Sequence, residues 1–254
     1  MRTDVSSTGR PQLLRVMTWN IAEGSLDRQR PPNSQLPIIA QRIREERPDI
    51  VLINEAKIWR WPFGGGVHQI RELQRLTALV HVHWGNTAAT GVAGFKALAV
   101  LSRFPLGPVA IHRLPSGYAI LRTTLVVGGV VHHVFSLRFN ARSEAEQIDG
   151  LRRLRSLVLA TPPAEAVIAA GDFNCGFGQS YFVNFAKSSR LRHALSERPD
   201  EFPCSHDEID HIFFRGDYVV RRSLYRCSPP NPSDHPWVFA EFQVRPRSPS
   251  RLRM

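Results

Sequence analysis

The residues best suited to chemistry in this sequence are the acid and the amide of Gly171-Asp172-Phe173-Asn174. They follow the apolar run Ala166–Ala170, which predicts a buried strand ending in a turn. Because side chains alternate along a strand, Asp172 and Asn174 are expected to point the same way. Asp172 supplies negative charge, and Asn174 supplies a neutral donor and acceptor. Asp and Asn are also common in ordinary turns, so this pair alone does not define a site.

Four other polar groups stand equally abruptly at the ends of apolar runs. In two of them, the carboxylate of Glu55 and the amide oxygen of Asn20 suit a hard, oxygen-preferring ion such as Mg²⁺ or Mn²⁺. We therefore predict that these strand ends converge on one pocket. The four groups are Thr18-Trp19-Asn20, Asn54-Glu55, Ile209-Asp210-His211 and Ser233-Asp234-His235.

In order and spacing, the five groups resemble the motifs of the endonuclease/exonuclease/phosphatase superfamily of metal-dependent phosphohydrolases. The resemblance extends from about Leu13 to Val244, and the segment Ala99–Pro105 also resembles that family. It implies an α/β fold, a four-layer αββα sandwich of two mixed, largely antiparallel sheets flanked by helices. It also implies hydrolysis of phosphate esters by metal-activated, in-line attack of water on phosphorus.

The resemblance implies that Asn20 and Glu55 hold the divalent ion and that Asp234 contributes to the same site. Such an ion would neutralise phosphate charge and help to stabilise a charged transition state. The alternative for Glu55 is a solvated acid at a strand end.

The resemblance also assigns catalytic roles. Asp172 matches the aspartate that activates water, Asn174 the asparagine that orients the phosphate, and His235 the histidine that faces the scissile phosphate. Asp210 would accept a hydrogen bond from the other ring nitrogen of His235 and hold the ring in place. The alternative is that the His–Asp pair is structural.

The stretch Val134–Asn140 departs from the family pattern. Many deoxyribonuclease-like and sphingomyelinase-like members carry a second histidine in a Thr-His-Leu strand end, and this stretch has none. Members resembling abasic-site endonucleases use a Tyr and, three residues later, an Asn; Asn140 matches that Asn, but the Tyr position is Leu137. We expect Arg138 to replace the missing group and to bind substrate with Asn140. The alternative for Arg138 is an ordinary surface arginine.

The segment Lys57–Gly66 follows Glu55 directly and should border the site. It alternates cationic and aromatic residues, and Trp59 and Trp61 could stack on unpaired bases while the cations meet phosphates. The alternative is that these rings cover the core.

Strand and helix patterns alternate along the chain without a repeat. Gly128-Gly129 between two valine-rich runs predicts a hairpin. Antiparallel hairpins together with crossover helices favour two mixed sheets packed face to face with helices outside. Three helices are expected: Gln35–Arg47 with Ser34 as its cap, Val67–Val80, and one that opens with the capping box Ser143-x-x-Glu146.

Charge and composition bound the function. The net charge is +11; without the +4 of residues 245–254 and the +1 of residues 1–12, the expected domain, residues 13–244, keeps +6. Both ends are expected to be flexible arms, the last of them basic. A basic field favours phosphate-rich partners, either nucleic acid or an anionic lipid surface.

The 254 residues and 43% hydrophobic content fit one enzyme domain, expected to be a monomer. No apolar run matches a membrane span, and the first residues do not resemble a signal peptide. The three cysteines have no zinc-like spacing, so a reduced cytoplasmic setting is expected, with a Cys204–Cys227 disulfide as the alternative.

Three hypotheses follow. The first is a Mg²⁺- or Mn²⁺-dependent nuclease or DNA-repair phosphodiesterase, which the charge and the aromatic segment favour. The second is a phosphatase or phosphodiesterase for lipid or small phosphate esters. The third is a catalytically silent nucleic-acid-binding protein, against which the retention of all five polar groups argues.

Overall fold

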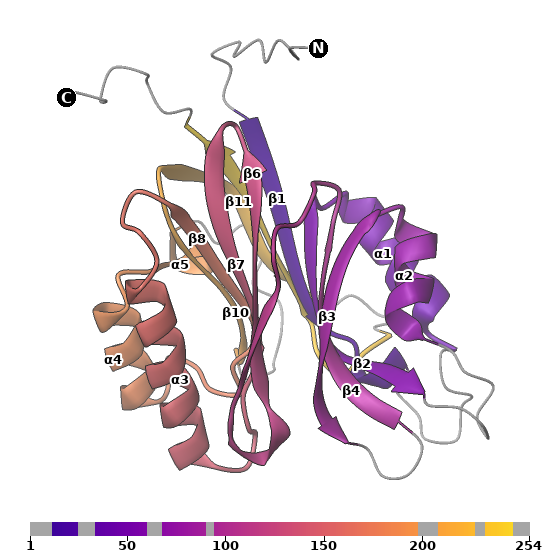
Figure 1. The fold of residues 1–254 in the computed structure, drawn as a ribbon, viewed down its shortest axis with the longest axis horizontal. Helices are drawn as coiled ribbons and strands as arrows, with labels where there is room; N and C mark the ends of the chain where they lie inside the picture. The colour runs from indigo at the N-terminus through magenta and orange to yellow at the C-terminus, as the bar shows by residue number, and fades with distance from the viewer. Residues whose placement is uncertain are drawn as a thin grey trace.

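The computed structural model describes residues 12–24, 34–59, 68–89, 94–197, 208–226 and 232–245. Within them, two six-stranded sheets face each other, and helices cover the outer face of each sheet (Figure 1). The strand orders are β11-β12-β1-β2-β4-β3 in the first sheet and β5-β6-β7-β8-β10-β9 in the second.

The first sheet consists of β1 (Gln12–Asn20), β2 (Ile50–Trp59), β3 (His81–Ala89), β4 (Gly94–Ser102), β11 (Tyr218–Arg226) and β12 (Trp237–Val244). The second consists of β5 (Ala110–Arg113), β6 (Ala119–Val127), β7 (Val130–Arg138), β8 (Ala166–Asp172), β9 (Arg192–His193) and β10 (Asp210–Arg215). The helices are α1 (Leu36–Glu46), α2 (Gln69–Thr77), α3 (Glu144–Leu159), α4 (Ser180–Ser188), α5 (Ala194–Glu197) and the short 3-10 turns η1 (Ala22–Gly24) and η3 (Pro115–Gly117).

Both sheets are mixed. The pairs β1–β2 and β7–β8 are parallel, and the other named strand pairs are antiparallel. The predicted αββα sandwich of mixed, largely antiparallel sheets is therefore confirmed.

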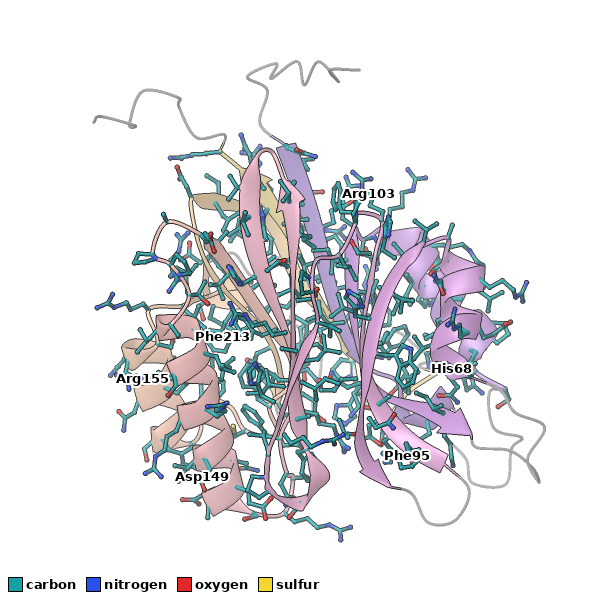
Figure 2. All side chains as sticks on the ribbon, viewed as in Figure 1. His68, Phe95, Arg103, Asp149, Arg155 and Phe213 are labelled. Carbon is teal, nitrogen blue, oxygen red and sulfur yellow. The ribbon has the colours of Figure 1, made fainter. Side chains whose placement is uncertain are left out.

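Alternation along the strands divides the core into three layers. In β1, Leu14 and Val16 enter the central layer between the sheets, whereas Met17 and Trp19 pack in the layer under α1 and α2. A third layer, which includes Phe135 and Leu154, lies between the second sheet and helices α3 and α4. Side chains fill the space between the sheets (Figure 2). Because one face of each strand enters the central layer, polar residues on that face must be paired or lie at its open end.

The predicted local elements are largely confirmed. The turn at Gly128-Gly129 joins β6 to β7 with Val127 opposite Val130, and both glycines have positive φ. The capping box of α3 forms in part, since Ser143 Oγ accepts a hydrogen bond from the Glu146 N–H at 3.3 Å. The cap predicted for the first helix is wrong: Gln35 precedes α1 in a helical conformation without a side-chain cap, so Ser34 has no capping position.

Among the described residues, no helix has both the length and the apolar character needed to span a bilayer. The two arms expected at residues 1–12 and 245–254 lie, apart from Gln12 and Arg245, outside the described residues, as do Cys204 and Cys227. Cys175 is a buried free thiol.

Candidate active site

Polar side chains replace apolar ones at one end of the central layer. Each lies on a strand face that carries apolar residues of the central layer two or four positions away. Asn20 therefore follows the β1 face that buries Val16, and Asp172 follows the β8 face that buries Ala170. By the same alternation, Lys96 of β4, Arg138 of β7 and Asp210 of β10 are directed toward this end. Strand pairing thus brings together residues far apart in the sequence.

Asn20 lies at the centre of this group and is fully buried. Its Nδ2 donates hydrogen bonds to Glu55 Oε1 and Asp172 Oδ2, each at 3.0 Å, and lies 3.2 Å from His235 Nε2. Its Oδ1 accepts a hydrogen bond from the Ala22 N–H at 3.1 Å. One amide therefore links both sheets, because Glu55 belongs to the first and Asp172 to the second.

Glu55 enters the site because β2 is irregular at this point. The register between β2 and β4 shifts between Ile53 and Ala56, and Glu55 has a φ of 55°. Its carboxylate forms ion pairs with Lys96 and Arg138, and its side chain is 11% exposed. Burial raises the pKa of Glu55, but the charges of Arg138 and Lys96 outweigh it, so the net shift is downward. Glu55 is therefore charged, although little of its side chain is exposed.

Arg138 bridges the acids of the two sheets. It pairs with Glu55, and its Nε lies 3.3 Å from Asp172 Oδ2. Its guanidinium lies 5.4 Å from the ring centre of Tyr118, a cation–π contact. Burial raises the pKa of Asp172, and the positive neighbours His235 and Arg138 only partly oppose this shift. A buried carboxylate with a raised pKa has the character of a base.

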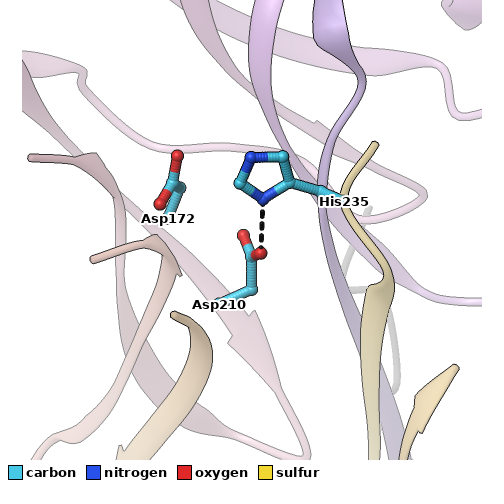
Figure 3. A group of neighbouring side chains, drawn as sticks. All are labelled: Asp172, Asp210 and His235. Atoms are coloured by element: carbon cyan, nitrogen blue, oxygen red, sulfur yellow. Dashed lines mark hydrogen bonds and ion pairs between the residues drawn. The ribbon is translucent and has the colours of Figure 1, made fainter. Parts of the chain in front are cut away.

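His235 is held by contacts on several sides. Its Nδ1 lies 2.7 Å from Asp210 Oδ2. Figure 3 shows this contact, with Asp172 beside the ring. Burial lowers the pKa of His235, but the hydrogen bond and charge of Asp210 outweigh it, so the pKa is raised to about 9. Trp19 Nε1 donates to the His235 carbonyl at 3.1 Å, and Ser233 Oγ accepts from the His235 N–H at 3.2 Å. The ring is therefore oriented and cationic at neutral pH.

Three of the predicted site residues, Asn174, Asn140 and Asp234, form no hydrogen bond with the Asn20 amide. Asn174 lies beyond the end of β8 with a φ of 52°, so strand alternation does not apply; its Nδ2 donates to the Phe139 carbonyl at 2.9 Å. Asn140 uses both ends of its amide in its own loop, donating to Glu146 and accepting from the Arg142 N–H. Asp234 is exposed, and its carboxylate lies 3.5 Å from Ser233 Oγ. The Trp59 side chain and all of Trp61 lie outside the described residues.

The oxygen-rich donor set fits a hard divalent ion. Asn20 would have to bind it through Oδ1, which accepts a hydrogen bond from the Ala22 N–H, because its Nδ2 faces Glu55. Among the described residues, ligand atoms of Asp172, Asp210 and His235 all lie within 4.8 Å of one another. A cationic His235 is a poor metal ligand, because ligands must be deprotonated. The charged, partly exposed Glu55 beside Asn20 is the better anchor. Asp210 Oδ1, which is buried without a hydrogen-bond partner in the described part of the chain, is a further acceptor near the site.

Sequence reasoning missed Lys96, Glu23 and Tyr118 around Glu55 and Arg138, whereas Lys57 begins the segment expected to border the site. Lys96 pairs with both Glu55 and Glu23, Lys57 pairs with Glu23, and Tyr118 packs on Arg138. One sequence feature could have indicated Lys96: it is a charged residue on the strand face that continues into Leu98 and Val100 of the central layer.

The chain belongs to the Endonuclease/Exonuclease/phosphatase family, a family of phosphoester hydrolases, whose model matches residues 17–235. No curated protein is significantly similar to it in sequence.

Solved structures share the fold at low identity. An endonuclease/exonuclease/phosphatase from Beutenbergia cavernae DSM 12333 is 24% identical, with a TM-score of 0.75 over 91% of this chain and 72% of that one. A family protein from Leptotrichia buccalis C-1013-b is 17% identical, with a TM-score of 0.73 over 91% and 100% of the two chains. D. rerio TDP2, complexed with single strand DNA product, is 15% identical, with a TM-score of 0.67 over 91% and 99%.

Proposed function

We propose that this protein is a divalent-metal-dependent phosphodiesterase that acts on nucleic acid as a nuclease or DNA-repair enzyme. The observation that carries the proposal is the convergence of Glu55, Asp172 and His235 on the buried amide of Asn20, with Arg138 between the two acids. A carboxylate base, a cationic imidazole and a guanidinium close together can accept a proton from water and stabilise the charge that develops during hydrolysis of a phosphate diester.

In this proposal each residue acts according to its surroundings. Asp172, whose pKa burial raises, accepts a proton from the attacking water. His235, oriented by Asp210, donates a hydrogen bond from Nε2 to the phosphate as charge develops. Arg138 neutralises equatorial phosphate oxygens.

Glu55 and Asn20, with Asp234 from the neighbouring loop, would hold a Mg²⁺ or Mn²⁺ ion. When bound, the ion polarises the phosphate and lowers the pKa of its water. Asn174 would orient the phosphate; its N–H bond to Asp172 Oδ1, at 3.0 Å, keeps it next to the base.

Nucleic acid is the favoured substrate for two reasons. The charge of +6 over residues 13–244 suits a polyanion. A protein of the same fold, D. rerio TDP2, has been solved with a single strand DNA product. Asn140, Trp59 and Trp61 remain candidates for contacts with the strand around the site. Because all these residues belong to one chain, the proposed activity needs only a monomer. The buried thiol of Cys175 is compatible with a cytoplasmic setting.

The test is a hydrolysis panel with Mg²⁺, Mn²⁺ or excess chelator. The panel contains single-stranded, duplex, abasic and 5′-blocked DNA, RNA, phospholipids and small phosphate esters. We expect metal-dependent cleavage of at least one nucleic acid. Turnover of a lipid or small ester alone would support the phosphatase hypothesis instead. DNA binding without turnover of any substrate would support a silent binding protein.

A further inference from the structure

The carboxylate of Glu55, the proposed anchor of the divalent ion, is already bound by two cations. Arg138 pairs with Oε1, and Lys96 Nζ donates to Oε2. A divalent ion that reaches Glu55 therefore meets positive charge on both oxygens. Like charges at such short range repel strongly in a site that water screens poorly. Movement of one of the two cations away from Glu55 would therefore favour binding of an ion.

Lys96 is the cation better able to move. Arg138 is held by three groups, Glu55, Asp172 and the ring of Tyr118. Lys96 carries a compact charge on a flexible four-carbon stem, and its side chain is 22% exposed.

A second acid is already in place to receive Lys96. Glu23 Oε1 lies 2.9 Å from Lys96 Nζ. Glu23 is held by η1, where its φ is 58°, and its Oε2 lies 2.8 Å from Lys57 Nζ. Lys57 and Lys96 are register partners on β2 and β4, so Glu23 can form an ion pair with each of them. Lys96 can thus leave Glu55 without losing its partner at Glu23.

We propose that Lys96 is an internal competitor of the divalent ion, bound to Glu55 in the metal-free protein and retained by Glu23 when the ion binds. This inference rests on the proposed metal-dependent function. It makes Lys96 a positioning residue that sets metal affinity, and it gives Glu23 the role of accepting the displaced ammonium.

The test is isothermal titration of metal-free protein with MnCl₂. Lys96→Met should bind Mn²⁺ about tenfold more tightly than the wild type, because a hydrogen bond to a charged group no longer has to be broken. Glu23→Gln should bind it more weakly, because the displaced ammonium loses the negative charge of its partner. In the double variant, the effect of Glu23→Gln should largely disappear, since the lysine that needs Glu23 is gone.

Lys57→Met is the matched control. It removes the same unit charge next to the same Glu23, but its ion pair is with Glu23 and not with Glu55. We expect it to change Mn²⁺ affinity by no more than about threefold. A Lys57→Met effect equal to that of Lys96→Met would overturn the inference in favour of general electrostatics.

Failure of the inference and failure of the proposed function give different results. Equal Mn²⁺ affinity in the wild type and Lys96→Met would overturn the inference and leave the metal site intact. Absence of Mn²⁺ binding in both would overturn the proposed metal site and the inference with it. Far-ultraviolet circular dichroism melts verify folding, and Lys96→Gln replaces Lys96→Met if that variant does not fold.

Discussion

At the scale of single residues, Asp172 and His235 lie close together (Figure 3), with ligand atoms within 4.8 Å of each other, and each has a distinct electrostatic environment. Burial raises the pKa of Asp172 and makes it a better proton acceptor, whereas Asp210 raises the pKa of His235 and keeps its ring cationic. The two groups would act on one transition state, as base and as hydrogen-bond donor. Their contributions to rate are therefore expected to be coupled.

We expect Asp172→Asn and His235→Ala each to lower kcat by about 10²–10⁴-fold, the usual contribution of an acid–base group. The double variant should be little worse than the poorer single variant. Rates on the best nucleic-acid substrate and thermal melts provide the measurement. If the single variants melt within a few degrees of the wild type and cleave the substrate at the wild-type rate, these residues are not the catalytic groups.

At the scale of elements, the placement of Asp172 depends on the close approach of β7 and β8. Gly171 has a φ of 148°, and a Cβ there would lie 2.0 Å from the Leu137 carbonyl oxygen. Leu137 is the register partner of Gly171 in the parallel β7–β8 pair. Only glycine fits this position, and it lies directly before the proposed base.

Gly171→Ala should therefore destabilise the fold by about 2 kcal/mol or more, through backbone strain and overpacking. It should also displace Asp172 and reduce turnover. Gly178→Ala is the matched control, since a Cβ at Gly178 meets nothing within 4 Å. Urea denaturation compares the two variants, and equal stabilities would contradict this account of β8.

The sequence predicts the strand ends well because burial imposes an abrupt change from apolar to polar residues at the edge of a core. It does not predict where a side chain points beyond the last strand residue. Asn174 is an example, since its left-handed backbone ends the alternation that applies to Asp172.

Pairing between distant strands is equally hidden in the sequence. Lys96 resembles a surface lysine until the register places it opposite Lys57 and next to Glu55. Ser34 is a good capping residue, but the N-cap position of α1 is Gln35, which already has a helical backbone and forms no side-chain cap.

At the scale of the whole molecule, buried neutral histidines link stability to pH. His132 is fully buried at the second sheet, its ring centre 5.6 Å from that of Tyr218, and burial lowers its pKa to about 4. The unfolded chain binds a proton at this residue below its usual pKa of about 6.5. The stabilisation is thus complete above that pH and is lost as pH falls toward 4.

His132→Phe keeps a ring beside Tyr218 but removes the titration. Between about pH 7 and pH 5, the wild type should lose about 2 kcal/mol of unfolding free energy through protonation of His132. The variant should not lose this contribution, so its stability relative to the wild type should rise by that amount. Urea titrations at both pH values measure the difference. A pH-independent difference would mean that His132 does not titrate in this way.

The charge of the whole molecule predicts how it meets a substrate. Contacts to phosphates release counterions, so affinity for single-stranded DNA should fall steeply with salt. Removal of residues 245–254, which carry four arginines, should reduce the salt slope but not abolish binding, because residues 13–244 keep +6. Fluorescence anisotropy across a salt series measures this slope. A flat response would indicate that phosphate contacts do not drive binding.

The central claim is that the polar end of the central layer hydrolyses phosphodiesters with a divalent ion held by Glu55. The most direct test is the rate of cleavage of labelled nucleic acid as a function of free Mn²⁺, for the wild type and Glu55→Gln. Loss of the carboxylate charge should raise the half-saturating Mn²⁺ concentration by at least about tenfold, while folding is kept. Cleavage by the wild type at full rate in excess chelator, or an unchanged Mn²⁺ dependence in Glu55→Gln, would contradict the claim.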